Sequence, residues 1–173
     1  MNAQPLALAP VQGPVFYLDE ATLQQGIAAS RGSSRGRIML PLHRSAEEGV
    51  QRLLNFVQPG SYIRPHLHPL PECVENIAVL SGAIGFLAYD EDGKILSKRR
   101  LAAGQPDSCM VDIEQGVWHT FVALAADTVV LEIKRGPYNA STDKKFAPWA
   151  PVEGSQDASG WLAETVEGFE PKS

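Results

Sequence analysis

The sequence predicts an all-β fold, a β-sandwich or small barrel, with a short helix before it and an extension after it. From about residue 37 to 136, nine short apolar runs alternate with turn-forming stretches at roughly ten-residue spacing. The chain also contains 15 Gly and 13 Pro, spread along its length, which favour many turns over long helices. The stretch YDEDGKI (89–95) is a typical β-hairpin, with Asp-Gly at its turn.

Three segments are expected along the chain: an N-terminal arm and short helix (1–36), a barrel domain (37–136) and a C-terminal extension (137–173). In the first, VFYL (15–18) is expected to pack as a short strand. Asp19 is a suitable N-cap for a helix over about 20–29. The extension contains two Trp and is expected to pack on the barrel or on a neighbouring subunit. The nine runs expected to form strands of the barrel are RIMLPL, VQRLLNFV, SYIRPHLH, VENIAVL, AIGFLAY, KILSKRRL, SCMVDI, VWHTFVAL and TVVLEIK.

Composition excludes some classes of function. The net charge is −5 and no long basic run is present, so nucleic acid is not an expected partner. No apolar run reaches the roughly 18 residues that a membrane-spanning helix needs. Cys73 and Cys109 match no disulfide framework and no CxxC motif, and the N-terminus does not resemble a signal peptide. These observations predict a cytoplasmic protein with free thiols.

A possible metal site stands out in two segments, GSYIRPHLHPLPECVENIAVLSG (60–82) and GVWHT (116–120). Three of the four histidines of the chain lie there, His66, His68 and His119, and Glu75 follows the first pair. Three imidazoles and one carboxylate are a typical ligand set for a mononuclear divalent metal. We therefore expect these residues to bind one metal ion.

The strand period of two predicts which side chains point into the barrel. In SYIRPHLH, the face that carries His66 and His68 also carries Tyr62 and Arg64. An interior arginine is costly unless it is paired, which suggests that Arg64 holds an anionic ligand, with Tyr62 close by. Glu72, in the proline-rich loop, is the alternative to Glu75 as acidic ligand.

The spacing of these residues resembles the two motifs of the cupin superfamily. The spacing to Gly82 selects Glu75 as the acid of the first motif. The gap from the histidines to Glu75 is longer than usual, so the spacing from the histidines alone would favour Glu72. In the second motif, Glu114 and Ala123 stand where Pro and Asn are usual. The residues that fill the motifs are Gly60, His66, His68, Glu75 and Gly82 for the first and Gly116 and His119 for the second.

A longer stretch, from near residue 34 to 151, resembles the WbuC-type cupin metalloproteins. That resemblance implies a double-stranded β-helix (a cupin or jelly-roll barrel), a bound divalent metal and a role in bacterial surface polysaccharide metabolism. Arg35, Arg37 and His43 keep the family pattern, which implies ligand binding at the pocket mouth or contacts on the surface or in a dimer. Met39 and Pro41 stand where the family usually has Asn.

Several functions are compatible with this site. The metal is expected to be Fe, Zn, Ni, Mn or Co, because the ligand set does not select among them. The first hypothesis is a metal-dependent enzyme, an isomerase or a dioxygenase, that acts on a small polar or anionic, sugar-related molecule. The alternatives are a non-catalytic cupin that binds or senses a small ligand and a metal-free cupin resembling sugar-nucleotide epimerases. A homodimer is expected, because edge strands of such barrels are often covered by a partner.

Overall fold

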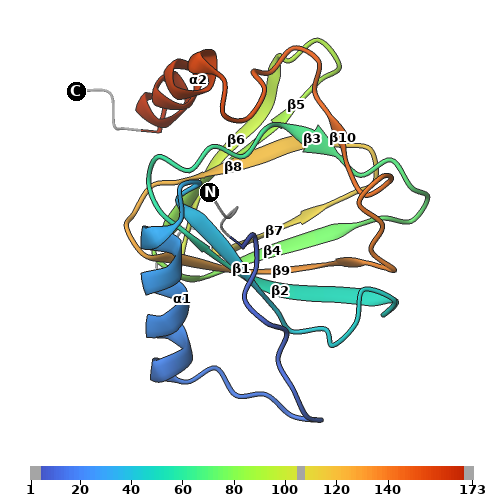
Figure 1. The fold of residues 1–173 in the computed structure, drawn as a ribbon. Helices are drawn as coiled ribbons and strands as arrows, with labels where there is room; N and C mark the ends of the chain where they lie inside the picture. The colour runs from blue at the N-terminus through green and yellow to red at the C-terminus, as the bar shows by residue number, and fades with distance from the viewer. Residues whose placement is uncertain (1–4, 105–107, 170–173) are drawn as a thin grey trace.

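Two antiparallel β-sheets face each other in the computed structural model, which describes residues 5–104 and 108–169 (Figure 1). Each sheet has five strands, in the orders β1-β2-β9-β4-β7 and β10-β3-β8-β5-β6. The jelly-roll barrel expected from the sequence is therefore confirmed. The elements are α1 (Glu20–Gly32), β1 (Arg37–Pro41), β2 (Val50–Val57), β3 (His66–Leu67), β4 (Glu75–Ser81), β5 (Ala83–Tyr89), β6 (Ile95–Ala102), β7 (Met110–Ile113), β8 (Trp118–Ala123), β9 (Thr128–Arg135), β10 (Lys145–Phe146) and α2 (Gln156–Glu167).

The strands follow the predicted runs closely, with two exceptions. The run SYIRPHLH forms only the two-residue strand β3, since prolines cannot donate to a ladder and interrupt regular pairing there. The prediction of a strand over VFYL is wrong, because residues 15–18 belong to neither sheet and Val15 and Tyr17 are exposed. An apolar run forms a strand only where a partner edge is available to it.

The main core lies between the two sheets and is built by inward-facing residues of both. The turn between β4 and β5 carries the chain from one sheet to the other at Gly82, whose φ is +77°. A Cβ atom there would lie 2.5 Å from Oγ1 of Thr128, so glycine is needed at this corner. The core residues are Val57, Ile77, Val79, Ile84, Phe86, Leu101, Ile113, Phe121, Ala123 and Val130.

Helix α1 covers the outer side of the first sheet. Asp19 is its N-cap, as predicted, and its side chain accepts a hydrogen bond from the backbone N–H of Thr22 at 2.8 Å. The helix approaches β2 closely where Gly26 lies against the ring of Phe56. Leu23 and Ile27 of the helix pack with Phe56 in a second hydrophobic cluster, which also contains Val11, Ile38, Leu40, Leu54 and Val129.

The C-terminal segment covers the outer side of the second sheet. Its strand β10 pairs with β3, and Phe146 lies opposite His66 in that register. Helix α2, which the sequence analysis did not predict, follows and packs against β8 through Leu162 and Ala158. In Figure 1 this helix lies near the β5–β6 end of the sheet.

Both cysteines are free, as expected. Within the described ranges, neither helix has the length and apolarity needed to cross a membrane.

Candidate metal centre

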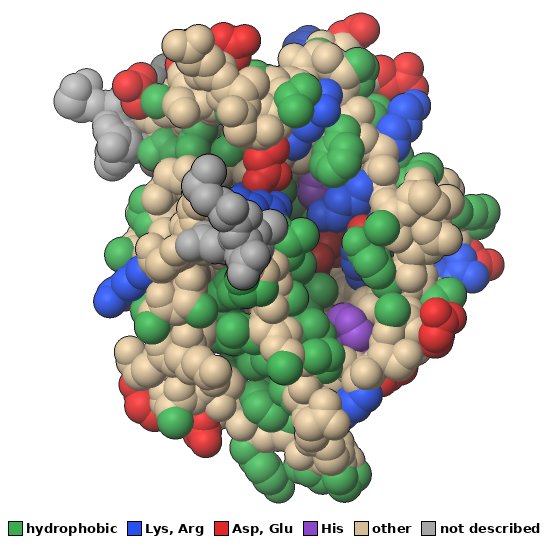
Figure 2. Space-filling view, viewed as in Figure 1, with side chains coloured by type: hydrophobic (Ala, Val, Ile, Leu, Met, Phe, Trp, Pro, Cys, Tyr) green, Lys and Arg blue, Asp and Glu red, His purple; other side chains and the backbone are tan. Residues whose placement is uncertain are grey.

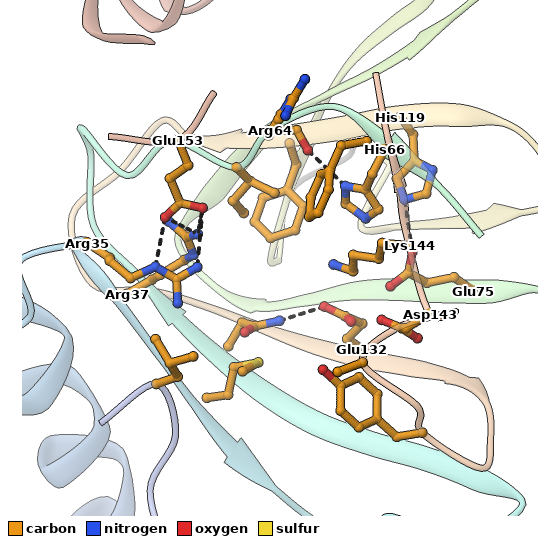
Figure 3. Close-up of a pocket in the computed structure, with 18 residues that line it drawn as sticks. Arg35, Arg37, Arg64, His66, Glu75, His119, Glu132, Asp143, Lys144 and Glu153 are labelled. Carbon is orange, nitrogen blue, oxygen red and sulfur yellow. Dashed lines mark hydrogen bonds and ion pairs between the residues drawn. The ribbon is translucent and has the colours of Figure 1, made fainter. Parts of the chain in front are cut away.

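The four predicted ligands meet inside the barrel. His66 on β3 lies directly opposite His119 on β8, His68 follows β3, and Glu75 begins β4 in the facing sheet. One potential ligand atom from each residue lies within 4.8 Å of those of the others. All four residues are almost completely buried, at 1–4% exposure. The geometry therefore brings together the set expected from the sequence, and Figure 3 shows three of its members at one end of a cavity.

Backbone carbonyls fix the orientation of each imidazole ring. The Nδ1 atoms of His66 and His119 lie 2.9 Å from the carbonyl oxygens of Arg64 and Val117. The Nδ1 atom of His68 lies 2.6 Å from the carbonyl oxygen of Asp143. A carbonyl oxygen can only accept a hydrogen bond, so each Nδ1 carries the donated proton. In a neutral imidazole the Nε2 lone pair is then available to a metal ion.

The lone pairs of two rings face the carboxylate of Glu75. Its Oε2 atom lies 2.9 Å from Nε2 of His119 and 3.2 Å from Nε2 of His68. Two neutral imidazole acceptors and a carboxylate oxygen would repel one another, so this arrangement requires a shared proton or a cation. Three nitrogen donors and one carboxylate oxygen suit a divalent transition metal. The residues present therefore fit a metal ion.

The ionisation of these residues agrees with cation binding. Burial holds the pKa of His66 well below its usual value, and the charge of Lys144 lowers it further, so the ring stays neutral. Burial alone would raise the pKa of Glu75. The contacts with His119 and His68 outweigh that effect and hold the pKa of its carboxyl well below its usual value. A neutral imidazole and an ionised carboxylate are the forms that bind metals.

The structure also distinguishes the two candidate acids. Glu72 lies in the loop before β4 with its side chain 84% exposed, and its nearest ionic partner is Arg135 at 3.9 Å. Its backbone has a φ of 58°, as a turn residue does. Glu75, not Glu72, lies with the histidines, so the spacing to Gly82 was the better guide. The longer gap after the histidines is a loop over residues 69–74 that belongs to neither sheet.

A cavity of about 330 Å³ opens beside the ligand residues. Figure 2 shows the corresponding hollow on the face of the molecule, with acidic and basic side chains around it. The lining is apolar on several sides and charged on others. Besides His66, Glu75 and His119, it consists of Leu6, Arg35, Arg37, Met39, Asn55, Ile63, Arg64, Phe121, Glu132, Tyr138, Ala140, Asp143, Lys144, Phe146 and Glu153.

Four charged residues of this cavity were missed by the sequence analysis, Glu132, Asp143, Lys144 and Glu153. The ammonium group of Lys144 lies between His66 and Glu132 in the view of Figure 3. Glu132, on β9, is 8% exposed and accepts a hydrogen bond of 2.6 Å from Nδ2 of Asn55. Burial raises the pKa of Glu132 to about 8, and the negative charge of Glu75 adds to the increase. A cation bound at Glu75 would offset the effect of the Glu75 charge on the pKa of Glu132.

The sequence of its strand did contain a signal that Glu132 points into the barrel. In TVVLEIK, the alternation that points Val130 into the core also points Glu132 and Lys134 inward. Charged residues at inward positions are rare unless they are paired or functional. Lys144 carried no comparable signal, because it follows the barrel strands and its position depends on how the C-terminal segment folds back.

A buried ion pair supports the backbone that holds His68. Nζ of Lys134 lies 2.6 and 2.7 Å from the two carboxylate oxygens of Asp143, whose carbonyl accepts from His68. Burial lowers the pKa of Lys134, but the charges of Glu132 and Asp143 outweigh that effect and raise it. Lys134 thus keeps its charge and fixes the loop that orients His68.

The residues predicted to bind a ligand are dispersed. Arg64 lines the cavity, but its side chain extends away from the metal ligands (Figure 3) and donates to the carbonyl of Ala147 at 2.7 Å. Arg37 lines the cavity and pairs with Glu153. Ligand binding by these two arginines stays a prediction.

Tyr62 and His43 do not line this cavity. Tyr62 packs against Trp161, and its hydroxyl donates to the carbonyl of Pro151 at 2.8 Å. Strand alternation placed it with His66, but residues 61–65 form no regular strand, so Ile63 lines the cavity instead. His43 lies just after the end of β1, and its Nδ1 atom lies 2.9 Å from the carbonyl oxygen of Arg52 on β2.

Comparisons with known proteins agree with the fold. The model of a domain of unknown function, DUF6016, matches residues 18–101. No curated protein matches the sequence. An oxalate oxidase in complex with the substrate analogue glycolate is similar in structure, with a TM-score of 0.51 and 16% identity over 82% of this chain and 76% of that chain. A recombinant oxalate oxidase in complex with glycolate has a TM-score of 0.50 and 16% identity over 79% of this chain and 74% of that chain.

A variant of oxalate decarboxylase from B. subtilis is also similar, with a TM-score of 0.46 and 16% identity over 57% of this chain. The match spans about a quarter of that longer protein, 24% of its length. At these identities, the oxalate oxidase structures inform on the fold alone. Together with the two facing five-stranded sheets, they identify the chain as a protein of the cupin fold.

Proposed function

We propose that the protein binds one divalent metal ion through His66, His68, Glu75 and His119 and acts with it on a small anionic substrate. The observation that carries the proposal is the meeting of three imidazole rings, each held by a backbone carbonyl, with one buried carboxylate, so that a potential ligand atom of each of the four residues lies within 4.8 Å of the others. Such preorganised donors favour a cation over a proton because they supply several ligands at once. A divalent ion bound there would act as a Lewis acid on an oxygen atom of the substrate.

The cavity supplies the anion-binding groups of this proposal. Lys144 places an ammonium group beside the metal ligands, where it would bind a carboxylate or hydroxycarboxylate of the substrate. The surrounding walls include the apolar side chains of Met39, Phe121 and Phe146, which lower the local dielectric constant and strengthen that electrostatic contact. The resemblance of the sequence supports a sugar-related acid as substrate and bacterial surface polysaccharide metabolism as setting.

Glu132 favours an enzyme over a ligand-binding module. Its carboxyl group is buried in the cavity, close to the metal ligands, and Asn55 holds one of its oxygens. The other oxygen would donate a proton to the bound substrate or remove one from it. Isomerisation needs such a proton transfer, and dioxygenation of a hydroxy acid begins with one, so both reaction classes are part of the proposal.

The test is a conversion assay with the metal-loaded protein. A panel of sugar acids and 2-hydroxy acids, beginning with the glycolate bound in the oxalate oxidase structures, is incubated with protein and followed by NMR, with oxygen consumption recorded in parallel. A metal-dependent change in one of these compounds that is lost in Lys144→Gln supports the proposal. Binding of compounds without conversion would instead assign a non-catalytic ligand-binding protein, and conversion by metal-free protein would contradict the proposal.

A further inference from the structure

A cluster of two arginines and one glutamate lies at the end of the cavity away from the metal ligands (Figure 3). Nη2 of Arg37 lies 2.7 and 2.8 Å from the two carboxylate oxygens of Glu153. Nε of Arg35 lies 2.7 Å from one of the same oxygens. Both oxygens of one carboxylate are thus held by two guanidinium groups, and this Arg35–Arg37–Glu153 cluster carries one excess positive charge.

Arg37 is held in place by contacts that do not depend on Glu153. Its Nη1 atom donates to the carbonyl of Tyr62 at 2.8 Å and to Oγ of Ser61 at 3.1 Å, and its side chain is only 10% exposed. If the carboxylate of Glu153 left, the guanidinium would therefore keep its position and retain unused donors. A preorganised, largely buried arginine fork of this kind matches a carboxylate or a phosphate.

The cluster is also the wall between two cavities. Arg35, Arg37 and Glu153 line the cavity of the metal ligands, and they also line a second cavity of about 250 Å³ next to α2. The side chain of Glu153 is 37% exposed and belongs to the connection that precedes α2. Space therefore exists on the far side of the cluster to receive the Glu153 side chain when it leaves the arginines.

We propose that Arg35 and Arg37 form a second anion subsite of the metal cavity and that the Glu153 carboxylate occupies this subsite until a ligand displaces it. The ligand class is then a small molecule with a metal-binding end, such as a 2-hydroxycarboxylate, and a second carboxylate or a phosphate at its other end. That one end of the ligand binds the metal ion rests on the proposed function. The anion subsite itself rests on the cluster alone.

The proposal also has a consequence for the C-terminal segment. Glu153 and the carbonyl of Pro151, which accepts from Tyr62, tie this segment to the barrel. Displacement of Glu153 breaks one of these two attachments, so a ligand with a second anionic group loosens the segment before α2. If the cluster were only a structural latch, ligands would leave it unchanged.

The anion subsite is tested first without metal. Inorganic phosphate is titrated into metal-free Glu153→Gln protein and followed by ³¹P NMR, with Glu164→Gln as matched control on the exposed side of α2. Phosphate binding by Glu153→Gln that is at least about tenfold tighter than in the control, and is lost when Arg35→Gln is added, is expected. Equal binding in Glu153→Gln and the control would overturn the subsite, whatever the metal centre does. Arg35 is used because Arg37→Gln removes contacts to Ser61 and Tyr62 and can unfold the chain.

The ligand class is tested on Zn²⁺-loaded wild-type protein by calorimetry with matched pairs. Lactate is compared with malate, 2-hydroxyglutarate and 2-hydroxyadipate, which vary the reach of the second carboxylate, and glycerate is compared with 3-phosphoglycerate. At least one diacid or the phosphate ester is expected to bind about tenfold tighter than its monoanionic partner. Arg35→Gln should remove this preference and leave lactate binding unchanged. Whether a diacid or the phosphate ester is preferred identifies the second group.

Two results would contradict the inference at this stage. The first is equal affinity within every pair, and the second is a preference that survives in Arg35→Gln. Hydrogen exchange provides a further readout, because the preferred ligand should increase exchange of the amides over residues 152–158, whereas lactate should not. If no compound, lactate included, binds the metal-loaded protein, the proposed function fails, and the phosphate titration still decides on the subsite.

Discussion

Nε2 of His119 lies 2.9 Å from Oε2 of Glu75, while Nδ1 of the same ring lies 2.9 Å from the carbonyl oxygen of Val117. The carbonyl fixes the proton on Nδ1, so the ring presents its lone pair to the carboxylate. These two residues come from different sheets and meet only because β8 and β4 face each other across the barrel. The fold thus holds two electron-pair donors together, and a cation between them would stabilise the folded protein.

Metal binding should therefore raise the free energy of unfolding. Adding a divalent metal at a free concentration about 100-fold above its Kd should stabilise the protein by about 2.7 kcal/mol, because the metal binds only the folded state. Thermal unfolding with Zn²⁺, Ni²⁺ or Mn²⁺, and again after EDTA, measures this effect. His119→Ala should abolish the shift, and an unchanged shift in that variant would assign the stabilisation to another site.

Replacing Glu132 should separate catalysis from metal binding. Glu132→Gln keeps the size of the side chain and can still accept from Nδ2 of Asn55, but it cannot transfer a proton. Turnover of any substrate found in the conversion assay should fall by about 10² to 10⁴-fold, with metal content unchanged. Full activity in Glu132→Gln would remove this residue from the mechanism.

The Arg35–Arg37–Glu153 cluster should make stability depend on pH in the acid range. Burial raises the pKa of Glu153, but its bonds with Arg35 and Arg37 outweigh this and lower it below its usual value. A carboxyl group with a lowered pKa in the folded state stabilises the protein above its unfolded pKa, and this contribution is lost as pH falls through the folded pKa. Because Glu153 is partly exposed, the contribution should be about 1 kcal/mol or less.

Denaturant unfolding of wild type and Glu153→Gln, from neutral pH down to about pH 3, measures this dependence. The difference in free energy of unfolding between the two proteins should shrink as the pH falls. The Glu164→Gln variant serves as control for the loss of one negative charge. A difference that is constant over the whole range would show that ionised Glu153 does not stabilise the fold.

The contact between α1 and the first sheet predicts opposite effects for two glycines of one helix. A Cβ atom at Gly26 would lie 2.3 Å from the buried ring of Phe56, so Gly26→Ala should destabilise the protein by about 1–3 kcal/mol. At Gly32 a Cβ atom would have no neighbour within 4 Å among the described residues. Gly32→Ala should therefore be neutral or stabilising, by up to about 1 kcal/mol. Equal effects in thermal unfolding would contradict the packing of α1 on β2.

Much of the barrel could be predicted from local sequence, because strand periodicity and turn residues act over short distances. β2 and β5 begin and end where their apolar runs do, and the hairpin at Gly93 forms at the Asp-Gly pair. The metal ligands were predictable for the same reason, since each lies at a fixed spacing from a turn glycine. Glu75 was preferred over Glu72 on that basis, and the structure agrees.

The remaining features depend on contacts between distant segments. β10 pairs with β3, and Lys144, which enters the cavity, directly precedes β10. Helix α2 had a local signal, the spacing of Ala158 and Leu162, but the sequence analysis predicted no helix in the C-terminal extension. Tyr62 was misplaced because strand alternation was extended through a segment that the prolines keep irregular. The predicted homodimer stays a prediction.

The metal content of the purified, untagged protein tests the central claim most directly. Elemental mass spectrometry is applied to wild type, His66→Ala, Glu75→Ala and the control Glu72→Ala, each after reconstitution and removal of free metal. The structure predicts close to one metal ion per chain in wild type and in Glu72→Ala, and loss of that metal in His66→Ala and Glu75→Ala. Wild-type protein that retains no metal, or a Glu75→Ala variant that keeps it, would contradict the metal centre described here.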